Sequence, residues 1–165
     1  MKRSIVVLDS RHKKALFCCG KPSLDTYLHT QAKQDVARKV AACFVLEGED
    51  GVIKGYYTLS SDAIKRGSLP ETTKKKLPTY KDLPVILLGR LAIDGQFARQ
   101  GFGKLLLLDA LKKSYETSNV VGAIAVVVDP LDEEARIFYE NYGFIRLPDS
   151  KRMFLPMATI KELFR

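Results

Sequence analysis

The chain has 165 residues, 46% of them hydrophobic, and a formal net charge of +8, which fits a single domain over residues 1–165 with a core of its own. Its longest apolar run, residues 120–128, is too short to span a bilayer, and the four apolar residues that follow Lys2, Arg3 and Ser4 are too few for a secretory leader. Three cysteines without a CxxC spacing make a poor disulfide framework, and the two histidines form no cluster with metal-ligand spacing. We therefore expect a cytoplasmic protein without a metal or a membrane span, whose basic charge fits either a polyanionic partner or a solvated surface.

Hydrophobic periodicity predicts alternating strands and helices along the chain. In chain order these are a strand over 4–9, a helix over 22–39, a hairpin over 40–61, a strand over 83–93, a helix over 103–118, a strand over 121–129, a helix over 132–144, one or two short strands within 145–157 and a helix over 158–164. Residues 68–84, rich in proline and lysine, are the one large loop candidate. This order predicts an α/β layered domain with a mixed sheet.

Local signals set the ends of several elements. Ser23 is the expected N-cap of the first helix, and Asp50-Gly51 is the expected hairpin turn. Asp132 suits the N-cap of the helix over 132–144, and Gly143 suits the position just after its end. Most of one face of the first helix is predicted to consist of Leu24, Tyr27, Leu28, Gln31, Ala32 and Val36. The polar face of the helix over 103–118 is predicted to consist of Lys104, Asp109, Lys112 and Lys113.

The segment "RQGFGK", residues 99–104, joins a buried strand to a helix. Its two glycines allow close approach of the backbone to a ligand, and the first helical turn presents free N–H groups at the positive end of the helix dipole. Arg99 and Lys104 add positive charge, so the segment indicates a pyrophosphate site. It matches neither the Walker A loop nor GxGxxG, and a plain turn that uses two glycines is the alternative.

About forty residues further on, four apolar or aromatic positions share one stripe of the helix over 132–144: Ala135, Phe138, Tyr139 and Tyr142. We expect Tyr142 to belong to the core. The phenol of Tyr139 needs a partner if it is buried, so this tyrosine could face a site.

Two segments, "LGRLAIDGQFARQGFGKLLLLDAL" and "DEEARIFYENYGF", resemble the GCN5-related N-acetyltransferases (GNAT). Four more segments, "LDTYLHTQAKQD", "GYYTLSS", "KKLPTYKDLPVILLGRLAID" and "LPMATIKELF", are similar to the GNAT toxins of bacterial type II toxin–antitoxin pairs. The resemblance runs from about Phe17 to Phe164. It implies the GNAT fold, an α/β (α+β) arrangement with a mixed, mostly antiparallel central sheet flanked by helices and acetyl-CoA at the splayed strands.

The resemblance also implies roles for particular residues. The backbone of Leu91, Ala92 and Ile93 would bind the pantetheine arm of acetyl-CoA. The pyrophosphate would be held by the loop residues Arg99, Gln100, Gly101, Phe102, Gly103 and Lys104. Tyr139 would protonate the leaving thiolate. The family has Gln or Arg three residues before the first glycine, and here that position is Ala98, so a polar group at this point is missing or is replaced by its neighbours.

Toxins of this branch acetylate the α-amino group of aminoacyl-tRNA, which blocks translation, and the resemblance implies the same substrate here. It also implies a small ribbon-helix-helix antitoxin as partner and a homodimer. Binding of tRNA would account for the basic charge, since phosphates are bound by lysines and arginines. The residues expected to bind tRNA are Arg38, Lys39, Lys65, Arg66, Lys74, Lys75 and Lys76.

Two other interpretations remain open. One is a GNAT enzyme that acts on protein N-termini, lysines or a small-molecule amine. The other is a nucleic-acid-binding module that uses the fold only as a scaffold. Binding of acetyl-CoA separates an enzyme from the second alternative, and growth arrest on expression without an antitoxin separates the toxin from the first.

Overall fold

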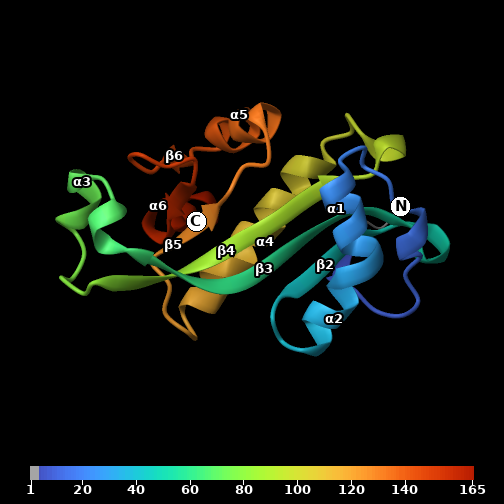
Figure 1. Cartoon of the computed structure of the whole chain (residues 1–165), viewed down its shortest axis with the longest axis horizontal. Helices are drawn as coiled ribbons and strands as arrows, with labels where there is room; N and C mark the ends of the chain where they lie inside the picture. Colours follow the sequence, from blue (N-terminus) through green and yellow to red (C-terminus); the bar gives the residue numbers. More distant parts are fainter. Residues whose placement is uncertain (1–3) are drawn as a thin grey trace. The chain divides into compact units, whose positions relative to one another are not determined.

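The computed structural model describes residues 4–165. Lys2 and Arg3, which entered the expectation that the chain has no secretory leader, lie outside the described residues. The chain divides into two compact units, Met1–Ser60 with Leu88–Ala110 (unit 1) and Ser61–Leu87 with Leu111–Arg165 (unit 2). Seven strands hydrogen-bond in the order β1-β2-β3-β4-β5-β7-β6 (Figure 1). The pairs β1–β2, β2–β3, β5–β7 and β6–β7 are antiparallel and β4–β5 is parallel, which confirms the mixed, mostly antiparallel sheet.

The helices and strands lie close to the predicted elements. The strands are β1 (Ser4–Val7), β2 (Ala42–Glu47), β3 (Ile53–Lys65), β4 (Asp82–Ile93), β5 (Ala125–Val128), β6 (Ile145–Arg146) and β7 (Met153–Pro156). The helices are α1 (Pro22–Thr26), α2 (Ala32–Ala37), α3 (Glu71–Lys74), α4 (Phe102–Ser118), α5 (Glu133–Asn141) and α6 (Met157–Leu163). A π-helical turn, Tyr27–Gln31, joins α1 to α2, so the helix predicted over 22–39 is one helical segment with a wider turn in its middle.

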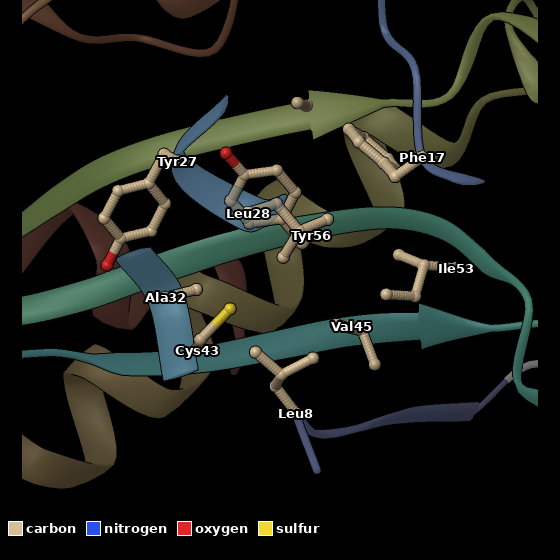
Figure 2. Close-up of a cluster of buried hydrophobic side chains, with 10 residues drawn as sticks. Leu8, Phe17, Tyr27, Leu28, Ala32, Cys43, Val45, Ile53 and Tyr56 are labelled. Atoms are coloured by element: carbon tan, nitrogen blue, oxygen red, sulfur yellow. The ribbon is translucent and has the colours of Figure 1, made fainter. Parts of the chain in front are cut away.

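The core of unit 1 lies between the α1–α2 segment and strands β2 and β3. Leu28 and Ala32 of this segment are fully buried and pack with Val45 of β2 and Tyr56 of β3 (Figure 2). The hairpin turn between β2 and β3 is at the predicted place, because Asp50 has φ 54° and Gly51 has φ 76°. At Gly51 a Cβ atom would lie 2.4 Å from the carbonyl oxygen of Arg11, so this position also requires glycine for space.

The core of unit 2 is built from β5, β7 and the parts of β3 and β4 in this unit. Its buried residues include Leu83, Val127 and Phe154. The predicted caps of α5 are confirmed: Asp132 accepts a hydrogen bond from the amide of Ala135 at 2.9 Å, and Gly143 has φ 95° just after the helix end. Both signals depend only on neighbouring residues, which explains why the sequence was sufficient for them.

Several local predictions are wrong. Ser23 is not the N-cap: the helix begins at Pro22, whose fixed φ and missing N–H suit the first helical position, after an extended Lys21. Gln31, predicted to share a face with Leu28 and Ala32, is exposed while they are buried, because the π-helical turn rotates the helix face at this point. Residues 68–84 are not all loop, since they contain α3 and the start of β4. The strand predicted over 121–129 is confined to β5, and Val121 is exposed.

Asp109 was predicted on the polar face of α4, but it is half-buried and accepts a hydrogen bond from the Tyr57 hydroxyl at 2.6 Å. Tyr57 is fully buried, and burial together with this carboxylate raises the pKa of its phenol. A charged residue at helical spacing can therefore point inward when a buried phenol needs an acceptor.

Candidate functional site

The predicted anion site follows the end of β4 in unit 1. Between β4 and α4 the backbone adopts left-handed conformations at two positions, with φ 61° at Arg99 and φ 80° at Gly101. Glycine takes this conformation without a steric cost, whereas a side chain is disfavoured there. The loop therefore uses Gly101 to turn the chain into the first residue of α4, Phe102.

The N-terminus of α4 is open and positively charged. The amide of Leu105 donates to the carbonyl of Gly101 at 3.2 Å, so the amides of residues 102–104 precede the first backbone hydrogen bond of the helix. A Cβ atom at Gly101 would meet no atom within 4 Å, which means that the space over this glycine is free. Arg99, Gln100 and Lys104 are exposed around it. Backbone N–H groups, a helix dipole and two cations together suit a phosphate or pyrophosphate.

Close packing inside unit 1 fixes the start of α4 against the end of β4. At Gly55 of β3 a Cβ atom would lie 2.7 Å from Cδ1 of Ile93, 2.8 Å from Cδ1 of Leu106 and 2.9 Å from the carbonyl oxygen of Ala92. Only glycine lets these elements approach so closely. Ala92 is buried in the unit 1 core, while Leu91 and Ile93 are half-buried. Residues 91–93 and the loop residues 99–104, predicted separately, thus belong to one packed unit.

Asp94 was not predicted as a site residue, yet it fixes the base of the loop. Its side chain is buried and accepts hydrogen bonds from the amides of Gln96 at 2.9 Å and Cys18 at 3.0 Å. The amide of Asp94 donates to Lys54 of β3 at 2.8 Å, and Gly95 donates to the carbonyl of Cys18 at 2.9 Å. An aspartate after a strand is too common a pattern to reveal a partner 76 residues earlier in the chain.

Lys54 is a second residue that sequence analysis missed. Its ammonium group lies 5.3 Å from the ring centroid of Phe97, just before the loop, and 5.4 Å from that of Phe102, within it. These are cation–π distances. The side chain therefore adds positive charge at the loop while the two rings keep it in place. In the sequence Lys54 is one polar residue within a predicted strand, and that pattern does not indicate this role.

Tyr139 lies in unit 2, on α5, and of the two tyrosines it is Tyr142 whose predicted core position is wrong. Tyr139 is 7% exposed, whereas Tyr142, expected in the core, is half-exposed. The Tyr139 ring contacts Phe138 and Phe144 at centroid distances of 5.3 and 5.2 Å. Both tyrosines fit the helical stripe and both rings contact Phe138, but of the two only Tyr139 contacts Phe144 among the described residues.

The hydroxyl of Tyr139 is available to a ligand. Within residues 4–165 it makes no hydrogen bond, and every fully buried side-chain polar atom in that range has a partner, so the hydroxyl reaches the surface while the ring is covered. Burial raises the pKa of this phenol above its ordinary value. Tyr139 is thus a proton donor that stays protonated at neutral pH.

The basic residues predicted to bind tRNA divide into exposed and engaged groups. Arg38 and Lys39, in unit 1, and Lys75 and Lys76, in unit 2, are exposed. The other three have partners within unit 2. Arg66 donates to the carbonyls of Pro78 and Lys74 at 2.9 Å each, the ammonium of Lys65 lies 3.3 Å from Asp82, and that of Lys74 lies 3.0 Å from Glu71.

Residues 4–165 contain no group of three or more histidine, cysteine and acidic side chains placed to bind a metal ion. Over the same range no helix has the length and apolar character that crossing a membrane requires.

Comparison with known proteins identifies the family. Residues 39–146 match the model of the acetyltransferase (GNAT) domain. The chain is 35% identical over 148 residues to the tRNA-acetylating toxin of Mycobacterium tuberculosis, a match that covers 89% of this chain and 87% of the relative. It is 31% identical to the probable toxin TacT of Sinorhizobium fredii, covering 98% of this chain and 95% of the relative.

Solved structures agree. A tyrosine-to-phenylalanine mutant of KacT has a TM-score of 0.93 at 32% identity, covering 99% of this chain and 100% of that one. AtaT complexed with acetyl-methionyl-tRNAfMet has a TM-score of 0.91 at 32% identity, with the same coverage. A mutant of AtaT bound to the C-terminus of the antitoxin AtaR and to acetyl-CoA has a TM-score of 0.83 at 28% identity, covering 98% of both chains. The chain therefore belongs to the GNAT acetyltransferase family, on the branch that contains these toxins.

Proposed function

We propose that this protein is a toxin that transfers the acetyl group of acetyl-CoA to the α-amino group of an aminoacyl-tRNA. The observation that carries the proposal is the open, cationic N-terminus of α4 behind Gly101, in a chain whose relatives include a tRNA-acetylating toxin. An acetylated α-amine is an amide and no longer a nucleophile, so it cannot accept a growing peptide. Translation would stop for that reason.

Acetyl-CoA would bind along unit 1. The backbone of Leu91, Ala92 and Ile93 would hydrogen-bond the pantetheine arm, and the loop residues 99–104 would hold the pyrophosphate. Lys54 sits against two rings at the loop, where it would add charge next to the phosphates. The base of the loop is fixed by Asp94, so the site would be formed before the cofactor arrives.

The reaction needs a neutral amine and a proton for the leaving group. The amine nitrogen attacks the thioester carbonyl carbon, the C–S bond breaks, and the sulfur takes a proton while the new amide loses one to solvent. An α-amino group has a pKa of about 7.7–8.0, so an appreciable fraction is neutral without a strong base. Positioning of the amine against the thioester would supply much of the rate.

Tyr139 would be the general acid in this step. Its hydroxyl has no partner among the described residues, and its raised pKa keeps the proton on the phenol until the thiolate forms. A general acid of this kind contributes roughly 10²–10⁴-fold in rate. The phenolate would then recover a proton from solvent.

The tRNA would bind through exposed cations. Lys75 and Lys76 are exposed in a segment that also exposes Tyr80, which is 68% accessible. Such mixtures of cations and aromatic rings suit nucleic acid. Arg38 and Lys39 would add contacts from unit 1. Lys65, Arg66 and Lys74 would contact tRNA only if they share their present partners with phosphates or exchange them for phosphates.

The same proposal includes the biological partners. A cognate antitoxin of the ribbon-helix-helix type would neutralise the protein, and support comes from the AtaT structure with its antitoxin segment. The protein would act as a homodimer in the cytoplasm, where charged tRNA and acetyl-CoA are present.

The test is acetyl transfer from labelled acetyl-CoA to a pool of charged tRNA, with uncharged tRNA and a basic protein as parallel acceptors. We expect label on the aminoacyl group alone, reduced by about 10²–10⁴-fold in Tyr139→Phe. Tyr142→Phe, just after the end of α5, is the matched control and should retain activity. Label on the basic protein alone would replace the proposal with a GNAT enzyme of another substrate class.

A further inference from the structure

One cation of unit 1 has a position that the predicted roles leave unexplained. Arg90 is half-buried on β4, directly before Leu91–Ile93 along the strand. Since side chains alternate along a strand, Arg90 shares a face with Ala92, which is packed in the core beneath the α1–α2 segment. A strand advances about 3.3 Å per residue, so the Arg90 Cα lies within about 10 Å of the Cα of Ile93, the last of the three residues expected to bind the pantetheine arm.

The guanidinium of Arg90 stacks on Tyr27. Its central carbon lies 3.4 Å from the centroid of the Tyr27 ring, which is a close cation–π contact. The ring itself is fixed, because Tyr27 is buried, stacks on Tyr56 at 6.4 Å with an interplanar angle of 13°, and donates from its hydroxyl to Asp35 at 2.8 Å (Figure 2). The guanidinium of Arg90 is therefore held against a fixed ring.

The contact between Tyr27 and Asp35 depends on the π-helical turn. Two residues eight positions apart in a regular helix are separated by more than two turns, and the wider turn at Tyr27–Gln31 lies between them. Gln31 donates to the second oxygen of the Asp35 carboxylate at 2.9 Å. Turns of this kind occur often at functional sites.

The donors of Arg90 remain unused in the part of the chain that the structure describes. A guanidinium carries five N–H donors, and in residues 4–165 none of those of Arg90 makes a hydrogen bond or an ion pair. The Asp35 carboxylate, whose pKa is lowered by hydrogen bonds from Gln31 and Tyr27 and by the charge of Arg90, forms no hydrogen bond or ion pair with that guanidinium within residues 4–165. A half-buried, oriented guanidinium with free donors is suited to bind oxygen atoms of a ligand in a bidentate manner.

We infer that Arg90 binds the aminoacyl end of the charged tRNA, by donating to oxygen atoms of its terminal nucleotide or its ester group. The inference rests on the proposed function. The phosphates of acetyl-CoA have their own site at residues 99–104, so the oxygen-rich group expected beside the acetyl-bearing end of the pantetheine arm belongs to the acceptor. Arg90 would hold that end so that the amine meets the thioester.

The test compares Arg90→Met and Arg90→Lys with Lys33→Met, which removes an exposed positive charge from α2. The readouts are KM and kcat for a pool of charged tRNA, the Kd of acetyl-CoA and the melting temperature. We expect Arg90→Met to raise KM for charged tRNA by about 10- to 100-fold, the usual effect of losing a hydrogen bond to a charged group, with the Kd of acetyl-CoA unchanged. Arg90→Lys should recover only a minor part, since it keeps the charge without the planar fork.

Short substrates separate the two sources of oxygen. The substrate is 3′-aminoacyl-adenosine, assayed with and without a 5′-phosphate. If Arg90→Met raises KM equally for both forms, the contact is to the ester group. If it raises KM only for the form with the phosphate, the contact is to the phosphodiester. Either result supports the inference.

Two results would overturn it. If wild-type protein acetylates charged tRNA and Arg90→Met has the KM of Lys33→Met, Arg90 has no substrate role while the proposed function stands. If wild-type protein gives no transfer to charged tRNA at all, the proposed function and this inference fail together.

Discussion

Two cation-rich loops of this protein use their charges differently. In the loop before α4, Arg99 and Lys104 are exposed around a glycine with free space above it. In the loop between β3 and β4, residues 66–81, Arg66 points back and donates to the carbonyls of Lys74 and Pro78. The first loop exposes its two cations, whereas in the second loop one cation forms hydrogen bonds to the loop's own backbone. The density of cations in a sequence does not reveal which use applies.

The largest effect is expected at Gly101 in the first loop. Gly101→Val places a β-branched residue at φ 80° and fills the space over the helix N-terminus, so acetyl-CoA should bind at least about hundredfold more weakly. Calorimetric titration with acetyl-CoA measures it. Gly20→Val is the matched control, because Gly20 also has a positive φ and free space but is not part of residues 99–104. Equal affinities in the two variants would show that Gly101 serves the backbone alone.

The second loop offers exposed charges for comparison. Reversing Lys75 and Lys76 together to Glu should lower kcat/KM for charged tRNA by about tenfold or more at low salt. It should also reduce the magnitude of the slope of log K for tRNA binding against log salt concentration by about 1.5–2, close to one unit for each lost phosphate contact. The control reverses Lys112 and Lys161, which are exposed in the same unit and give the same net charge. If both pairs behave alike, the effect is one of total charge and the loop is no tRNA site.

Arg66 should behave in the opposite way to Lys75. Arg66→Met removes two hydrogen bonds to loop carbonyls, which costs about 1–2 kcal/mol after allowance for partial exposure. Urea denaturation measures the free energy of unfolding, and amide hydrogen exchange of residues 66–81 shows whether the loop opens. Lys75→Met should leave both unchanged. Unaltered exchange in Arg66→Met would mean that the buried Leu69 alone holds the loop.

Sequence analysis was sufficient where the signal is local. The turn at Asp50-Gly51, the Asp132 cap, Gly143 and the strand–loop–helix order at residues 99–104 depend on residues close in the chain. It was insufficient where a partner lies far away or where helix geometry changes. The hydrogen bonds from Tyr57 to Asp109 and from Cys18 to Asp94 span 52 and 76 residues. A π-helical turn shifts every later residue of the first helix, and no residue pattern announced it.

The smallest effect concerns pH and tests whether Tyr139 belongs with the ligand-directed groups. Activity should rise with pH as the α-amine loses its proton near about 7.7–8.0, and it should show no fall up to about pH 10, since the raised pKa keeps Tyr139 protonated. Because the pKa of Tyr139 is higher in the folded than in the unfolded state, it contributes to the free energy of unfolding. This contribution is complete below the unfolded pKa of about 10 and is lost as the pH rises beyond it. A pH–rate profile and unfolding at alkaline pH measure both. A fall in activity near neutral pH would contradict the assignment.

The most direct test of the account is to express the protein without its antitoxin, isolate tRNA and examine the aminoacyl-adenosine ends released by nuclease with mass spectrometry. The account predicts growth arrest together with an acetyl group on the α-amine of one or a few aminoacyl-adenosines. Both effects should be absent in Gly101→Val and strongly reduced in Tyr139→Phe, and both should persist in Gly20→Val. Growth arrest with unmodified aminoacyl ends would contradict it.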